Sequence, residues 1–148
     1  MDKKTDNIQS LLNQLYAKAT DPDEYILHRL YISEILAGAC ITGELLGVPN
    51  AKEYFYEIRK YLTEEPQLNG RSLRKLPPER AILEIAEQFL SAANDKTRAF
   101  SSRYSYTAML MGLTRAALCA QMEEMGPFLK AAEELRTQIS REESAEKV

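Results

Sequence analysis

Three residues in the segment YISEILAGACITGELLG (31–47) repeat at intervals of four: Glu34, Gly38 and Thr42. Four residues is about one helical turn, so a carboxylate, a gap and a hydroxyl form one stripe along a predicted helix. The positions beside the stripe are apolar and predict that it faces inward: Leu27, Leu30, Tyr31, Ile41 and Leu45. We expect Thr42 to donate to the carbonyl of Gly38 within its own helix.

An inward-facing Glu34 requires either contact with water or a partner, because an unpaired buried charge is costly. The candidate partner is Arg115, the only charged residue in the run 104–122. If the two helices pack together, Gly38 and Gly112 permit a close approach and Glu34 and Arg115 form a buried polar pair. We interpret this pair as structural, and a small-molecule or catalytic pocket beside Glu34 is the alternative.

The chain lacks the sequence motifs of most classes of catalytic site. His28 is the only histidine, which argues against di-iron carboxylate sites and against zinc sites with several imidazoles. Cys40 and Cys119 lack metal-ligand spacing and are expected to be two small buried thiols. The sequence contains no glycine-rich phosphate loop and no nucleophile elbow. We therefore expect no catalytic residue, no metal and no cofactor, and we favour a non-enzymatic protein.

Basic residues are concentrated in the middle of the chain. Residues 70–115 contain eight Lys and Arg against four Asp and Glu, a net charge of +4, while the remainder has a net charge of −7. Guanidinium groups pair with phosphates, and aromatic rings can stack on unpaired bases. The candidate partner-binding residues are Arg71, Arg74, Lys75, Arg80, Arg98, Arg103 and Tyr104.

These basic residues allow three interpretations. They pair with acidic helices of their own chain or are simply solvated, they dock on an acidic protein surface, or they bind nucleic acid through the 70–106 region. The sequence pI of about 5.3 argues against a dedicated DNA-binding protein. A protein partner is therefore our expectation, and nucleic acid is the alternative.

Helical periodicity throughout the chain predicts an all-α fold, a single-domain bundle of about six helices over residues 1–148. Capping patterns predict that the second helix begins at residues 21–24 and ends at Gly47, and that the third begins at Asn50 and ends before Pro66. Residues 63–77 form the longest predicted connection.

A first helix is expected near residues 5–19, and the second half of the chain predicts three further helices, the fourth to the sixth. Their expected bounds are 78–94, about 104–126 and 128–139, with a tail that frays from about residue 141. The fifth predicted helix is apolar on nearly all sides, which is typical of a helix surrounded by others. We therefore expect the second and fifth helices to be central.

The composition is typical of a globular protein, with 148 residues, 45% hydrophobic and 28% charged. The polar start MDKKTDNIQ argues against a secretory signal, and Arg115 makes the run 104–122 a better core helix than a membrane span. We expect a cytoplasmic protein-interaction module without membrane contact, such as an adaptor, a chaperone or a small subunit of a larger complex. Self-association is compatible with this expectation.

The nucleic-acid alternative makes a specific prediction. Labelled single-stranded RNA or DNA is expected to shift in a gel at low salt and to lose the shift as salt rises, because phosphate binding releases counterions. Changing Arg71, Arg74 and Lys75 together to Ala is expected to abolish the shift. The absence of any shift at low salt would exclude this function.

Overall fold

The computed structural model describes residues 2–66 and 75–147, and within these ranges it contains α-helices, two short 3₁₀ helices and no strand. The all-α prediction is confirmed. The elements are α1 (Lys3–Ala19), α2 (Ile26–Leu45), α3 (Ala51–Ile58), η1 (Arg59–Tyr61), α5 (Pro78–Asn94), α6 (Phe100–Cys119), η2 (Glu123–Met125) and α7 (Gly126–Glu146).

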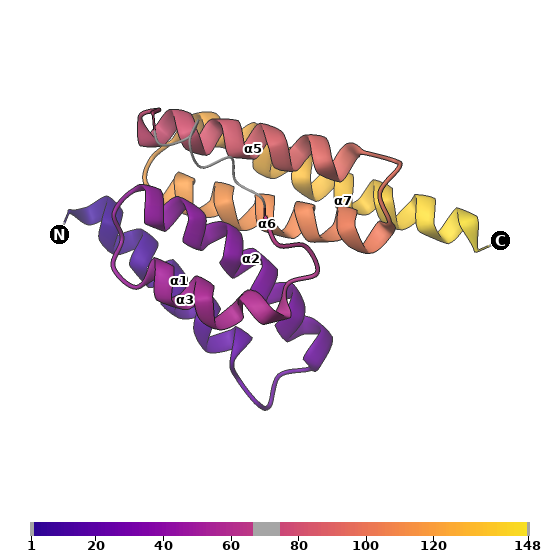
Figure 1. Cartoon of the computed structure of the whole chain (residues 1–148), viewed down its shortest axis with the longest axis horizontal. Coiled ribbons are helices and arrows are strands. Elements are labelled where there is room, and N and C mark those ends of the chain that lie inside the picture. Colours follow the sequence, from indigo (N-terminus) through magenta and orange to yellow (C-terminus); the bar gives the residue numbers. More distant parts are fainter. Residues whose placement is uncertain (1, 67–74, 148) are drawn as a thin grey trace.

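Helices α2 and α6 form the centre of the bundle and run in the same direction (Figure 1). Helices α1 and α3 pack on α2, and α5 and α7 pack on α6. Residues 32–43 of α2 and 107–114 of α6 are buried at every position. The predicted central position of these two helices is confirmed, although α2 is covered even on the side that has the more polar sequence.

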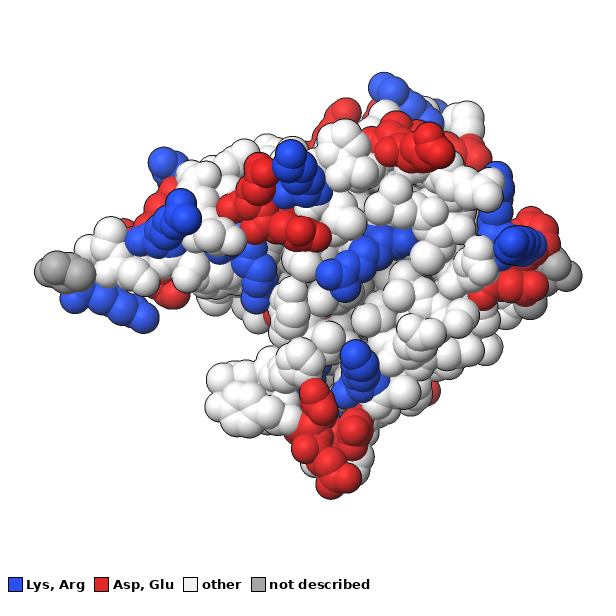
Figure 2. Space-filling view, turned by 180° about the vertical axis from the view of Figure 1, so that it is seen from behind, with Lys and Arg blue, Asp and Glu red and all other residues white. Residues whose placement is uncertain are grey.

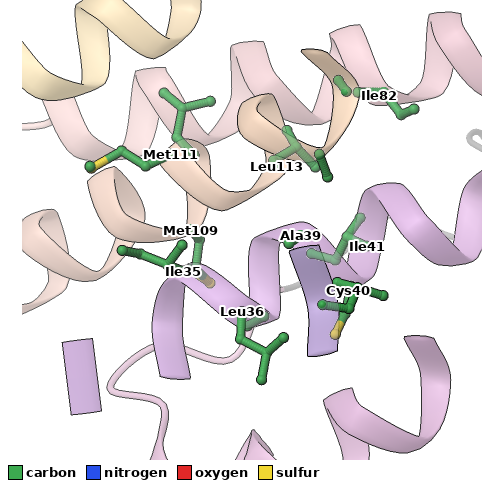
Figure 3. Close-up of a cluster of buried hydrophobic side chains, with 14 of the residues drawn as sticks. Ile35, Leu36, Ala39, Cys40, Ile41, Ile82, Met109, Met111 and Leu113 are labelled. Atoms are coloured by element: carbon green, nitrogen blue, oxygen red, sulfur yellow. The ribbon is translucent and has the colours of Figure 1, made fainter. Parts of the chain in front are cut away.

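Two glycines allow the backbones of α2 and α6 to touch. A Cβ atom at Gly38 would lie 1.8 Å from the carbonyl oxygen of Met109, and one at Gly112 would lie 1.7 Å from that of Ile35. No side chain fits at either position, because the nearest atoms are backbone atoms. The close approach predicted from these two glycines is confirmed. Side chains from both helices pack around it, among them Ile35, Leu36, Ala39, Met109 and Leu113 (Figure 3).

Thr42 forms a hydrogen bond that differs from the predicted one. Its hydroxyl donates to the carbonyl oxygen of Leu113 on α6 at 2.8 Å, rather than to Gly38 within α2. The close crossing brings a carbonyl of the neighbouring helix within reach of the fully buried hydroxyl. Thr42 therefore links the two central helices.

The start of α2 was predicted too early. Asp21 Oδ1 accepts from the amide of Asp23 at 2.9 Å, and the amide of Glu24 donates to the Asp21 carbonyl at 3.1 Å. These bonds close a separate turn, after which α2 begins at Ile26 with Tyr25 as its N-cap. Residues 21–24, three of which are acidic, consequently form a loop before the helix.

Helix α6 ends at Cys119, earlier than the predicted end near residue 126. Gln121 adopts a left-handed conformation, with φ of 64°, and the amide of Met122 donates to the carbonyl of Ala117 at 3.1 Å. This is the hydrogen bond of a Schellman C-cap. The same motif follows the last residue of α2, and there the left-handed position is occupied by the expected glycine, Gly47. The sequence signal was missed at α6 because glutamine occupies the position that usually holds glycine.

The C-terminal segment is helical where fraying was expected. Helix α7 continues to Glu146. Glu142 Oε2 accepts from Nη1 of the buried Arg103 at 2.7 Å. This bond joins the last turns of α7 to α6, because Glu142 is the counter-charge of Arg103.

Gly38→Ala is expected to destabilise the protein by more than about 3 kcal/mol, because the added methyl group meets backbone atoms that cannot rotate away. Urea unfolding followed by circular dichroism measures the effect. Gly126→Ala is the matched control, because no atom lies within 4 Å of its added Cβ. A Gly38→Ala protein within about 0.5 kcal/mol of wild type would contradict the backbone contact between α2 and α6.

Candidate functional site

The predicted basic residues do not share one surface within the described residues. Arg71 and Arg74 lie outside the described ranges. Lys75 and Arg80 are exposed at the start of α5, whereas Arg98 is exposed beyond its end. A 17-residue helix is about 25 Å long, so these two groups are far apart. On the face shown in Figure 2, Lys and Arg side chains are interspersed with Asp and Glu.

Two of the exposed arginines have acidic neighbours in their own chain. Arg80 pairs with Glu84 at 3.7 Å. Arg98 pairs with Asp95 at 3.6 Å, and its guanidinium carbon lies 5.1 Å from the centre of the Tyr106 ring. These contacts agree with the intramolecular interpretation of the basic residues.

Arg103 is an interior residue with an exposed fraction of 2%. Its Nε donates to the carbonyl of Ala93 at 2.9 Å, and its Nη1 pairs with Glu142. The hydrogen bond from Arg103 lowers the pKa of Glu142. The structure therefore places Arg103 in a contact between α5, α6 and α7.

The predicted pair of Glu34 with Arg115 is not formed within the described residues. Because α2 and α6 run in parallel, the stripe on α2 meets α6 in the same order: Glu34 with Ser105, Gly38 with Met109, and Thr42 with Leu113. Arg115 lies ten residues beyond Ser105, about 15 Å along the helix axis. The prediction was wrong because the sequence does not specify the register of the two helices.

Glu34 instead faces a pocket of about 290 Å³ between the first half of α2, the start of α6 and the middle of α7. Thr63, from the connection after η1, also lines it. The remaining lining residues are mainly apolar or aromatic: Leu27, Leu30, Tyr31, Ser101, Tyr104, Ala108 and Arg136. The pocket is the location that was expected for the small-molecule alternative.

The Glu34 carboxylate is only partly satisfied. Its exposed fraction is 9%, and Oε1 accepts from the Thr63 hydroxyl at 3.4 Å. Oε2 has no hydrogen-bond partner among the described residues. Burial raises the pKa of Glu34, while the nearby hydroxyls of Ser105 and Thr63 and the positive charge of Arg136 act in the opposite direction.

Arg136 is a site residue that the sequence did not reveal. Its guanidinium lies over the rings of Tyr31 and Tyr104, 4.3 Å and 5.1 Å from the ring centres. Its Nη1 also donates to the Tyr104 carbonyl at 3.1 Å and to the Thr107 hydroxyl at 3.0 Å. In sequence Arg136 is one more charged residue of a polar helix, and nothing in its spacing distinguishes it from the others.

Tyr104 is half-buried and lines this pocket. Its hydroxyl donates to Glu143 at 3.4 Å. Of the predicted partner-binding residues that the structure describes, Tyr104 is therefore the one that lines the pocket beside Glu34.

The two cysteines differ in exposure. Cys40 is buried, and burial raises the pKa of its thiol to about 12. Cys119 is half-buried, and burial also raises its pKa. Across residues 2–66 and 75–147, no group of three or more His, Cys, Asp or Glu side chains is placed to hold a metal ion.

An exposed apolar segment adjoins the same pocket. Tyr25, Ile26 and Leu27 have exposed fractions of 68%, 53% and 61%. They follow the acidic loop that contains Asp21 and Asp23. The first turn of α2 thus combines uncovered apolar side chains with a neighbouring negative charge.

Comparisons with protein-family models, curated proteins and solved structures found no match to this chain. In the part of the chain that the structure describes, no helix has both the length and the apolar character needed to cross a membrane.

Glu34→Gln is expected to make the protein more stable at neutral pH. The raised pKa means that ionised Glu34 opposes folding, so stability falls as pH rises from the ordinary value of 4.5 through the folded-state pKa. Urea unfolding at several pH values should show a gain at pH 7 that disappears below 4.5, where Glu34 is protonated in both states. Glu44→Gln, an exposed change on the same helix, is the control. A loss of stability at pH 7 would contradict the incomplete pairing of Glu34.

Proposed function

We propose that this chain is a non-enzymatic helical protein-interaction module that binds its partner through the exposed start of α2. The proposal rests on three consecutive exposed apolar residues, Tyr25, Ile26 and Leu27, whose side chains are each more than half accessible to solvent. Burying one large apolar side chain contributes roughly 1.5–3 kcal/mol. Three adjacent ones therefore offer a substantial driving force for association.

The position of this segment explains why the fold itself leaves it uncovered. Complete burial of α2 begins only at Ile32, so its first turns are less covered than the rest of the helix. Tyr25 is the N-cap and makes no side-chain capping bond. A rigid helix that presents apolar side chains in this way is a suitable binding surface, because little conformational order has to be gained on association.

The charge beside the segment indicates the chemistry of the partner. Asp21, Asp23 and Glu24 lie in the preceding loop. Figure 2 shows uncharged surface next to acidic side chains at the lower end of the molecule, with a basic side chain beside them. Charge complementarity favours a protein that presents apolar side chains flanked by Lys or Arg. An adaptor, a chaperone and a small subunit of a complex would all use such a surface.

Nucleic acid has less support as the ligand. Arg103 is buried against Glu142, and Arg80 and Arg98 each have an acidic neighbour. Their charges are thus already partly compensated within the chain, so fewer are available to neutralise phosphates.

Ile26→Asp is expected to weaken partner binding by at least about tenfold, because it places a charge in an apolar contact. Aspartate is favourable in the first turn of a helix, so α2 should still form. A photo-crosslinking residue at position 25 identifies the partner, and calorimetry with the purified pair then measures affinity. Tyr56→Asp, which changes an exposed aromatic residue on α3, is the control.

Two results would contradict this proposal. One is a partner whose affinity is the same for wild type and Ile26→Asp. The other is a crosslink at position 25 that joins only copies of this chain, together with self-association that Ile26→Asp removes, because the surface would then serve a homo-oligomer.

A further inference from the structure

A carboxylate and a guanidinium face the same small pocket without pairing. Glu34 and Arg136 both line it, yet no salt bridge joins them among the described residues. Arg136 is held in place by the rings of Tyr31 and Tyr104 and by two bonds from Nη1. Glu34 is fixed on a fully packed helix, with Thr63 on Oε1. Both charges are therefore positioned by other contacts.

Both groups have hydrogen-bonding capacity that the described residues do not use. Glu34 is about nine-tenths buried, and its Oε2 atom has no partner within hydrogen-bond distance. The buried hydroxyl of Ser105 has none within that distance either, but it lies close enough to the carboxylate to lower the pKa of Glu34. Arg136 uses only Nη1 in the bonds given above. Buried polar groups are nearly always paired in folded proteins. A ligand that donates to Glu34 and accepts from Arg136 would satisfy both.

The opposite signs of these charges restrict the class of ligand. A simple amine would be attracted by Glu34 but repelled by Arg136, and a simple carboxylate would experience the reverse. A molecule with both charges close together complements both. The volume of about 290 Å³ lies just below the usual range of ligand pockets, roughly 300–1,000 Å³, so only a small ligand fits.

We propose that this pocket binds a small zwitterion, an α-amino acid with an apolar side chain. Its ammonium group donates to Glu34 Oε2 and Ser105 Oγ, and its carboxylate accepts from the Nε and Nη2 groups of Arg136. Its side chain lies against Leu27, Leu30 and Ala108, which provide the apolar lining. This site adjoins the proposed partner surface, and Leu27 belongs to both.

The probes are L-leucine and two analogues that each lack one charge, 3-methylbutylamine and 4-methylpentanoate. Isothermal titration calorimetry and thermal unfolding of the full chain measure binding. We expect L-leucine to bind and to raise Tm, and each analogue to bind at least about tenfold more weakly, because each loses a charge-assisted hydrogen bond.

Variants connect the binding to the pocket. Glu34→Gln and Arg136→Gln are each expected to weaken L-leucine binding at least about tenfold. Glu44→Gln on α2 and Arg141→Gln on α7 make the same chemical changes at exposed positions and should leave it unchanged. If Arg136→Gln fails to fold, Glu34→Gln still tests the site, because removing a partly satisfied carboxylate should not destabilise the fold.

Three results would overturn the zwitterion site. They are no heat and no Tm change with millimolar L-leucine, equal affinity for L-leucine and 3-methylbutylamine, and unchanged L-leucine binding by Glu34→Gln. Ile26→Asp separates this proposal from the partner surface: it should keep L-leucine binding while losing the protein partner.

Discussion

The backbone contact between α2 and α6 at Gly38 and Gly112 sets the arrangement of the whole bundle. Each glycine lies against a carbonyl of the opposite helix, so neither helix can rotate or shift without a steric clash. Thr42 adds a hydrogen bond to the Leu113 carbonyl in the same contact. With the crossing fixed, α1 and α3 cover one side of the pair and α5 and α7 cover the other (Figure 1).

The same crossing determines which polar side chains meet. Because α2 and α6 pack in parallel, Glu34 lies level with Ser105. The pocket is at this end of the helix pair, and α7 contributes Arg136 to it. Arg136 stacks on tyrosines of both central helices, so it is oriented without taking Glu34 as its ion partner. The pocket and its unused hydrogen-bonding capacity are thus consequences of helix packing. The start of α2 is also left uncovered, since complete burial of this helix begins only at Ile32.

Local sequence signals predicted most of the helices but misplaced several of their ends. Pro78 marks the start of α5, and Gly47 marks the end of α2, because their backbone preferences act within a few residues. The start of α2 was misplaced, since the Asp21 side chain closes a turn in place of a helix cap. The continued helix at the end of α7 depends on Arg103, which lies 39 residues away from Glu142 in sequence. No local pattern contains that contact.

Sequence patterns alone predicted the all-α fold, the two central helices and the close approach at Gly38 and Gly112. These follow from apolar periodicity and from the absence of a side chain, which are properties of single segments. The folded structure was needed to identify the partners of Glu34, the interior position of Arg103 and the contribution of Arg136. Those depend on the relative direction and register of helices, and periodicity within one helix carries no information about either.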